Sequence, residues 1–216
     1  SELTSRKDKI TYWFLKEELE SSIAMRVCKR NLWNVDPEDG LIMTFLIIAQ
    51  VQPVGSDDFR KQAMTRWNKF PDLMNTEIKN LKLGLSQGYS MPKEIVNVVI
   101  NQLYDLCSYG IQDSPFMIPA RTDGSPSFHK QWESLITDSI IPSIKEYQKF
   151  LEIEYLPKAR NEVSIQALPN GEQCYQAYIR KYTTVNKTGH EIFEEGQAIV
   201  AKNSLQIKKL GKELYD

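Results

Sequence analysis

Residues 132–155, WESLITDSIIPSIKEYQKFLEIEY, decide the fold class of this chain. Large apolar side chains recur in this stretch every three or four residues, which is the spacing of one face of an α-helix. They are Trp132, Ile136, Ile140, Ile144, Tyr147, Leu151 and Tyr155. Because the spacing continues through Pro142, the stretch predicts one long helix that is kinked at the proline.

The same helical spacing governs the residues upstream. It predicts a helix over residues 7–30 and further helices that begin near Leu41, Asp57, Pro71 and Ser90. We expect the Ser90 side chain to cap the last of these helices. The chain is therefore predicted to be all-α, a multi-helix bundle or array with one long kinked helix and at most a short extended arm.

Further along the chain, the pattern changes twice. Residues 163–168, VSIQAL, alternate apolar and polar side chains, which predicts a short strand or an extended arm. Asn170 then stands where it can cap a following helix. Thr188 and Glu191 have the spacing of a capping box, which predicts the start of a final helix.

One internal segment, residues 108–127, breaks the helical spacing for longer than any other. It contains two glycines and three prolines, which favour turns over helix. A loop of this length in a folded domain is often functional or mobile. We expect residues 1–216 to form one helical region with a possible internal joint at 108–127.

The charge and hydropathy of the chain exclude two classes of partner. With 27 basic and 28 acidic residues the formal net charge is −1, and no long run of one sign occurs. The electrostatic footprint of a nucleic-acid-binding protein is therefore missing, and we predict no nucleic-acid partner. The longest apolar run, residues 41–49, is too short to span a bilayer, so no membrane span is predicted.

The cysteines leave the compartment open. Cys28, Cys107 and Cys174 are few, odd in number and far apart, and no CxxC pair occurs. We predict buried reduced thiols rather than a zinc knuckle or a disulfide framework. The chain has no export signal but begins at Ser1 rather than Met, so both the periplasm and the cytoplasm remain open.

No complete catalytic motif is present. Residues 190–194, HEIFE, resemble the H-E-x-x-H helix of zinc peptidases, but Glu194 replaces the second histidine and the only other histidine is His129. The capping of a helix that begins near Thr188 explains the same residues. Nucleophile elbows and phosphate-binding loops are absent as well. We predict neither catalytic nor metal-binding residues in this chain.

Residues 156–184 are the best candidate for a binding surface. Arg160 follows a helix end, Asn170 begins the next helix, and Tyr175 and Tyr182 belong to an aromatic stripe on it, with Thr184 near its end. Such side chains can donate hydrogen bonds to a peptide backbone or a carboxylate. The alternative is structural, because amphipathic stripes usually pack between helices and an arginine can brace a helix junction.

Several short motifs, each weak alone, are specific in combination. They are EYLPKAR at 154–160, ALPNG at 167–171, CY at 174–175, YTT at 182–184, WNV at 33–35, AQVQP at 49–53, TEI at 76–78 with Gly84 and Gly88, and DSPF at 113–116. Through these motifs the chain resembles a bacterial family, the domain-of-unknown-function 885 family. The resemblance covers nearly the whole chain from about Trp13 onward.

The resemblance implies a function that the residues alone do not. Family chains are longer, helical and zinc-peptidase-like, with an H-E-x-x-x-G-H type metal motif in the C-terminal half, whereas this chain is similar to the N-terminal half. Zinc and a peptide substrate are therefore expected of the full-length protein, and this chain is expected to form one wall of a substrate cleft. The cleft-facing candidates are Arg160, Asn170, Tyr175, Tyr182 and Thr184.

A second hypothesis is a non-catalytic helical module that binds a protein or peptide partner without any further half. It is supported by the balanced charge, the aromatic stripe and the lack of a catalytic constellation. The sequence predicts neither the oligomeric state nor the particular peptide bound.

Overall fold

The computed structural model of the protein describes residues 5–215, and these form two compact units. Unit 1 contains the residues up to Lys29 and those from Ser164 onward, and unit 2 contains residues 30–163. Unit 2 is thus inserted into the sequence of unit 1. The segment 108–127, expected to be an internal joint, lies within unit 2, whereas the two unit boundaries fall after Lys29 and Val163.

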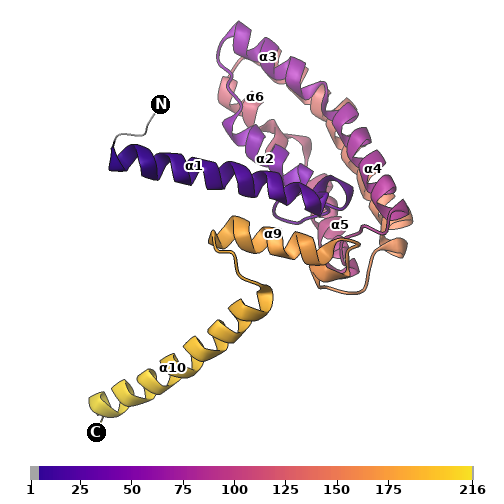
Figure 1. Ribbon diagram of the computed structural model, residues 1–216. Coiled ribbons are helices and arrows are strands. Elements are labelled where there is room, and N and C mark those ends of the chain that lie inside the picture. The colour runs from indigo at the N-terminus through magenta and orange to yellow at the C-terminus, as the bar shows by residue number, and fades with distance from the viewer. Residues whose placement is uncertain (1–4, 216) are drawn as a thin grey trace. The chain divides into compact units, whose positions relative to one another are not determined.

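The all-α prediction is confirmed, since no strand occurs among residues 5–215 and a single bridge joins Pro92 to Arg160. The α-helices are α1 (Arg6–Ala24), α2 (Leu41–Val51), α3 (Asp57–Trp67), α4 (Phe70–Ser86), α5 (Lys93–Ser108), α6 (Ile118–Asp123), α7 (Pro126–Leu135), α8 (Ile141–Phe150), α9 (Gly171–Thr183) and α10 (Gly189–Tyr215) (Figure 1). Short 3₁₀ segments are η1 (Met25–Cys28), η2 (Arg30–Leu32), η3 (Ile111–Asp113), η4 (Pro115–Met117), η7 (Leu156–Lys158) and η8 (Ile165–Ala167).

The stretch that predicts the fold forms a continuous helical run. It consists of α7, the π-helical segment η5 (Ile136–Ile140), α8 and a second π-helical segment η6 (Leu151–Tyr155). Every residue of its apolar stripe is buried. Pro142 lies in the first turn of α8, where its missing N–H fits after the wider π turn. The helix therefore continues through the proline, as the spacing predicts.

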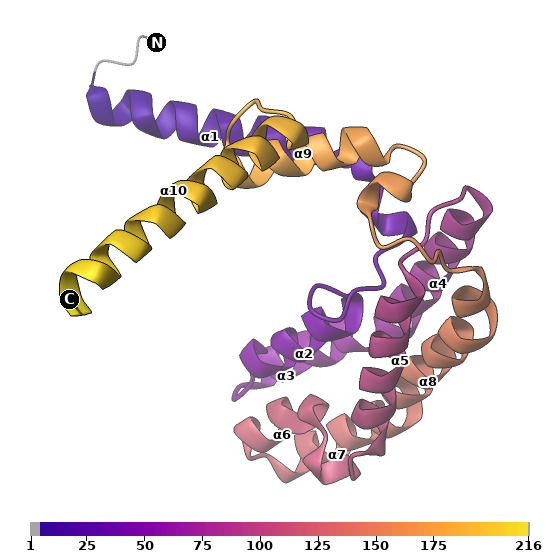
Figure 2. The same cartoon turned by 90° about the horizontal axis from the view of Figure 1, so that it is seen from below.

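Both α4 and α5 pack against α8 of this run (Figure 2). An aromatic cluster occupies the core, with Trp67 in the middle and fully buried. Four rings surround it at centroid distances between 5.4 and 6.5 Å, those of Phe45, Phe70, Phe116 and Trp132. Ring contacts of this kind stabilise a core by more than the burial of their apolar surface alone provides.

A glycine permits one close backbone approach in this unit. A Cβ atom on Gly84, in α4, would lie 1.8 Å from the carbonyl oxygen of Leu32 in η2. Any larger residue would therefore separate α4 from η2. Gly84 is one of the residues that carry the family resemblance, and this contact gives it a packing role.

The segment 108–127 is folded onto unit 2 rather than looped out. It forms η3, η4 and α6, and Asp123 anchors its end. The Asp123 carboxylate accepts hydrogen bonds from the Gly55 backbone N–H at 2.6 Å and from Arg60 Nε at 2.9 Å. Burial raises the pKa of Asp123, but these hydrogen bonds outweigh it and hold the pKa below its usual value.

In unit 1, α1 lies beside α9. The Arg180 guanidinium on α9 forms a bidentate ion pair with Glu17 on α1, with N···O distances of 2.7 and 2.8 Å. It also donates one hydrogen bond to Glu20, at 3.0 Å. The hydrogen bonds from Arg180 lower the pKa of Glu17. Planar pairing of this kind fixes the register of two helices.

The prediction of reduced thiols is wrong for two of the three cysteines. Cys28 in η1 and Cys174 in α9 form a disulfide, with their Cα atoms 4.7 Å apart. Sequence spacing does not reveal this bond because 146 residues separate the pair. Cys107 is the free cysteine, and its half-buried position raises the pKa of its thiol.

Three local predictions about residues near helix ends have mixed outcomes. Residues 163–168 form no strand; they contain the 3₁₀ turn η8. Ser90 does not cap α5, because its hydroxyl accepts the backbone N–H of Arg160. The Thr188–Glu191 capping box is confirmed by reciprocal hydrogen bonds of 2.7 and 3.2 Å.

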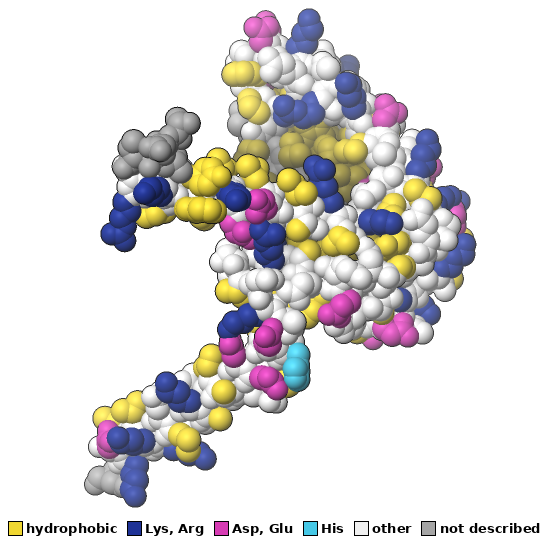
Figure 3. Space-filling view, viewed as in Figure 1, with side chains coloured by type: hydrophobic (Ala, Val, Ile, Leu, Met, Phe, Trp, Pro, Cys, Tyr) yellow, Lys and Arg dark blue, Asp and Glu magenta, His cyan; other side chains and the backbone are white. Residues whose placement is uncertain are grey.

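Two helices of unit 1 carry apolar side chains that no other part of residues 5–215 covers (Figure 3). On α1 these are Ile10, Tyr12, Trp13, Phe14, Leu15, Leu19 and Ile23. On α10 they are Phe193, Ile199, Val200, Leu205, Ile207, Leu210 and Leu214. Neither helix has the length and apolar content needed to cross a membrane, and the same holds for the other described helices.

Candidate functional site

Arg160 lies in unit 2, two residues after the end of the 3₁₀ turn η7, and joins two parts of that unit. Its backbone N–H donates to Ser90 Oγ at 3.0 Å, and its Nε donates to the Ser90 carbonyl at 2.8 Å. Its Nη1 donates to the carbonyl of Glu162. Burial lowers the pKa of the Arg160 guanidinium. The arginine therefore holds the loop before α5 against the end of the long helical run.

The other four candidates belong to α9 and its ends, in unit 1. Asn170 is the N-cap residue of α9, but its amide does not cap the helix and donates to the Val27 carbonyl instead. Thr184 ends the helix in a left-handed conformation with φ of 59°. The 13 residues of α9 separate Asn170 and Thr184 by about 20 Å at 1.5 Å per residue, so they do not share one small site.

The two candidate tyrosines have different surroundings. Tyr175 is 39% exposed and lies against Gly189, where an added Cβ would be 2.6 Å from its ring. Tyr182 is 74% exposed and stacks on Tyr178, with ring centroids 5.8 Å apart and planes inclined by 6°. Tyr182 thus presents an accessible aromatic face, whereas Tyr175 fixes the start of α10.

A groove in unit 1 includes one of the candidates. It has a volume of about 580 Å³ and is lined by α1 side chains together with Thr184. Trp13 and Phe14, which are 60% and 75% exposed, form its aromatic part. Lys16 and Glu17 add charge at its edge. The groove combines aromatic surface with polar groups, as peptide-binding surfaces do.

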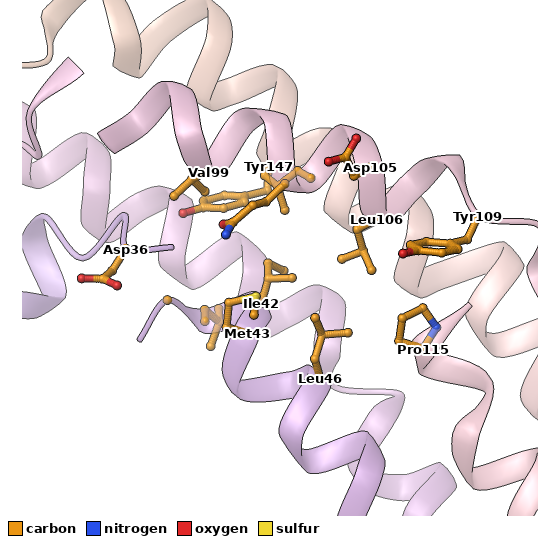
Figure 4. A pocket seen from close by; sticks show the side chains of 14 residues that line it. Asp36, Ile42, Met43, Leu46, Val99, Asp105, Leu106, Tyr109, Pro115 and Tyr147 are labelled. Atoms are coloured by element: carbon orange, nitrogen blue, oxygen red, sulfur yellow. The ribbon is translucent and has the colours of Figure 1, made fainter. Parts of the chain in front are cut away.

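Unit 2 contains a more enclosed cavity of about 230 Å³ between α2 and α5 (Figure 4). Apolar side chains line most of it, and Tyr147 of α8 lies along it. Sequence reasoning placed Tyr147 on a buried stripe and did not recognise that it borders a cavity. The residue spacing within α8 does not predict that α2 and α5 leave a cavity between them.

Sequence reasoning also missed Glu77 of α4, a carboxylate with a strongly shifted pKa. Partial burial raises the pKa of Glu77 to about 7, and residues 5–215 provide no ion pair or hydrogen bond for it. Its position gives a usable signal, because it stands three residues after Met74 and four before Leu81, both buried.

We expect Glu77→Gln to stabilise the protein above pH 7 and to change little below pH 4.5. The folded-state pKa of Glu77 is about 7 against an ordinary value of 4.5, so the folded protein binds the extra proton and stability falls as the pH rises between these values. After allowance for solvent screening, the gain above pH 7 is about 1–2 kcal/mol.

Urea unfolding at several pH values measures this effect. Glu94→Gln is the matched control, because Glu94 is an exposed carboxylate on α5. Equal pH profiles for Glu77→Gln and the unchanged protein would contradict the prediction.

The described residues do not fit a zinc site. His129 lies 3.8 Å from Glu133, and His190 lies 3.2 Å from Glu194. Each pair supplies two ligands, whereas catalytic zinc needs three protein ligands. No group of three His, Cys, Asp or Glu side chains within residues 5–215 is arranged to hold a metal.

The fold and these two concavities define an all-helical protein with surfaces suited to binding. Over residues 1–216 the chain matches the family described as "Bacterial protein of unknown function (DUF885)", and it belongs to that family. A comparison with curated proteins finds no match.

A solved structure has a similar fold. It is that of the putative lipoprotein from Colwellia psychrerythraea, with 21% sequence identity and a TM-score of 0.73. The alignment covers 79% of this chain and 31% of the lipoprotein chain. This chain therefore spans less than a third of the length of that protein, and at this identity the likeness concerns the fold alone.

Proposed function

We propose that the protein is the substrate-binding, N-terminal part of a zinc-dependent, peptidase-like hydrolase whose zinc ligands lie outside residues 1–216. The proposal is supported by the resemblance of the sequence motifs, which implies longer, zinc-peptidase-like relatives; the chain belongs to the DUF885 family, whose function is unknown. The length of the similar solved structure agrees with a longer polypeptide. The binding role rests on one observation, the groove along α1.

The groove has the chemistry of a peptide subsite. Trp13 and Phe14 are exposed aromatic side chains, which hold apolar groups with little loss of side-chain entropy. Thr184, at its edge, supplies a hydroxyl for hydrogen bonding to a peptide backbone. Lys16 offers a positive charge to the carboxylate end or an acidic side chain of a peptide, whereas the Glu17 carboxylate is already paired with Arg180.

The other candidates have different parts in this proposal. Tyr182, stacked on Tyr178, adds an exposed aromatic face in the same unit. Asn170 and Tyr175 act indirectly: Asn170 positions the start of α9 through Val27, and Tyr175 positions the start of α10 through Gly189. Arg160 is a positioning residue of unit 2, because its donors are engaged with Ser90 and Glu162.

The disulfide supports the periplasm over the cytoplasm as the compartment. Cys28 and Cys174 are joined, and such bonds persist in the oxidising bacterial periplasm but are rare in the reducing cytosol. The similar protein described as a lipoprotein agrees with an exported location.

A non-catalytic binding module is the second candidate function. It is supported by the cavity between α2 and α5, which lies in unit 2 and uses none of the groove residues. A module of this kind would bind a ligand without cleaving it.

The test compares two neighbouring α1 variants in the complete protein that contains this chain, with metal content and peptide cleavage as readouts. We expect one zinc ion per molecule and cleavage of short peptides. Phe14→Ala should raise KM roughly tenfold, the equivalent of about 1.4 kcal/mol of lost contact. Leu15→Ala is the control, because Leu15 is also exposed but does not line the groove. A protein that stays metal-free and inactive after zinc loading would overturn the hydrolase; peptide binding without cleavage would then favour the module.

A further inference from the structure

The cavity between α2 and α5 contains a polar atom that the protein does not satisfy. Tyr147 is 4% exposed, and its hydroxyl has no hydrogen-bond partner among residues 5–215. Every side-chain nitrogen or oxygen in that range that is fully enclosed has a hydrogen-bond partner. Because the Tyr147 hydroxyl has none, it is not fully enclosed, and we infer that it is accessible from the cavity that Tyr147 lines. A ligand that brings a hydrogen-bond acceptor into the cavity would give this hydroxyl a partner that the protein does not supply.

The remaining walls are mainly apolar. Ile42, Met43 and Leu46 line the cavity from α2, and Leu106 lines it from α5 (Figure 4). An apolar cavity of about 150 Å³ is already sufficient to hold benzene in a protein core. A cavity of about 230 Å³ therefore has room for one ring or branched aliphatic group with a small substituent.

The charges around the cavity select against anions. Asp36 and Asp105 line it, and no Lys, Arg or His does so. Glu77 lies close enough to interact electrostatically with Tyr147. Asp36 is partly offset by Arg30, whose Nη2 lies 3.9 Å from its carboxylate, but a carboxylate ligand would still meet the charges of Asp105 and Glu77. Gln102 donates its amide N–H to the Pro37 carbonyl, which leaves its own carbonyl oxygen able to accept from a ligand.

We propose that this cavity is a binding site for a small neutral ligand: an apolar ring or branched group next to a hydrogen-bond acceptor that the Tyr147 hydroxyl recognises. The acceptor is a carbonyl in an amide or ketone, and an amide N–H can also reach Gln102. The site is separate from the α1 groove of the proposed function and involves neither zinc nor cleavage.

Methyl NMR of the protein with benzamide as the probe tests the site. Benzamide should shift the methyl signals of Ile42, Leu46 and Leu106 saturably, whereas benzoate, of nearly the same shape, should bind at least tenfold more weakly because of its charge, a difference of about 1.4 kcal/mol. Tyr147→Phe should weaken benzamide roughly three- to tenfold by removing one hydrogen bond, and should leave toluene unchanged because it has no acceptor.

A cavity-filling pair gives the steric control. Leu46→Trp should abolish benzamide binding, and Ile47→Trp should not, because Ile47 is the next residue of α2 and is 59% exposed. Circular dichroism must first show that both variants are folded; if Leu46→Trp is not, the Tyr147→Phe comparison decides. Absence of saturable shifts with benzamide, or equal weakening of benzamide and toluene by Tyr147→Phe, would overturn the proposal.

One further probe distinguishes the two sources of such a ligand. N-acetylphenylalaninamide carries the same ring and carbonyl chemistry within a peptide-like molecule. Binding of both probes at the same methyl groups would assign the cavity to a peptide side chain. Binding of benzamide alone would assign it to free small molecules. Neither result depends on hydrolase activity, so the failure of either proposal can be recognised by itself.

Discussion

Replacing both Cys28 and Cys174 by serine is expected to lower the free energy of unfolding by about 4–5 kcal/mol. The disulfide closes a loop across a sequence separation of 146 residues, and the chain-entropy model assigns about 5 kcal/mol to a loop of that length. Both side chains are fully buried, so serine hydroxyls at these positions also lose solvation. Guanidinium unfolding followed by circular dichroism measures the loss.

Two controls separate the bond from the sulfur atoms. Reduction of the unchanged protein should give a similar loss, and should not destabilise the double variant further. Cys107→Ser should change stability much less, because Cys107 forms no disulfide. Titration of the denatured, unreduced protein should detect one thiol; three thiols would show that the bond does not form.

The second large effect is expected for Trp67→Ala, with a loss of about 4 kcal/mol, in the range for removal of a large buried aromatic side chain. Trp67 is fully buried within the aromatic cluster, and its indole N–H donates to Gln52 Oε1 at 3.1 Å. The substitution therefore leaves a cavity beside four rings and removes a partner from Gln52, which is 8% exposed.

Urea unfolding with tryptophan fluorescence measures the Trp67→Ala effect. Trp13→Ala is the matched control, because Trp13 is 60% exposed on α1 and its removal should cost less than about 1 kcal/mol. Similar losses for the two variants would mean that Trp67 is not central to the core of unit 2.

The sequence predicts the helices of this fold well because a helix with one buried face has apolar residues at every third or fourth position. The stripe from Trp132 to Tyr155 is buried throughout, and the Thr188–Glu191 capping box forms as expected. The π-helical segments η5 and η6 cannot be predicted from this spacing, since each adds a residue to a turn and the apolar positions stay buried. The alternation in residues 163–168 does not produce a strand, because residues 5–215 contain no other strand with which this segment could pair.

The candidate site is less predictable because it depends on distances between segments far apart in sequence. The sequence places Asn170, Tyr175, Tyr182 and Thr184 correctly around one helix, α9, but not the groove that Thr184 shares with α1. It also gives no indication that Ser90, expected to cap α5, instead accepts a hydrogen bond from Arg160. The Cys28–Cys174 bond and the cavity beside Tyr147 are tertiary features of the same kind.

The disulfide also determines how the molecule carries mechanical load. Cys28 and Cys174 lie on either side of unit 2 in sequence, so a pulling force applied outside them passes from one sulfur to the other and bypasses the residues between. Unit 2 would then bear no tension while α1 and α10 are stretched. For the same reason, a single backbone cut anywhere from residue 29 to residue 173 leaves one covalently joined molecule, which separates into two pieces only after reduction.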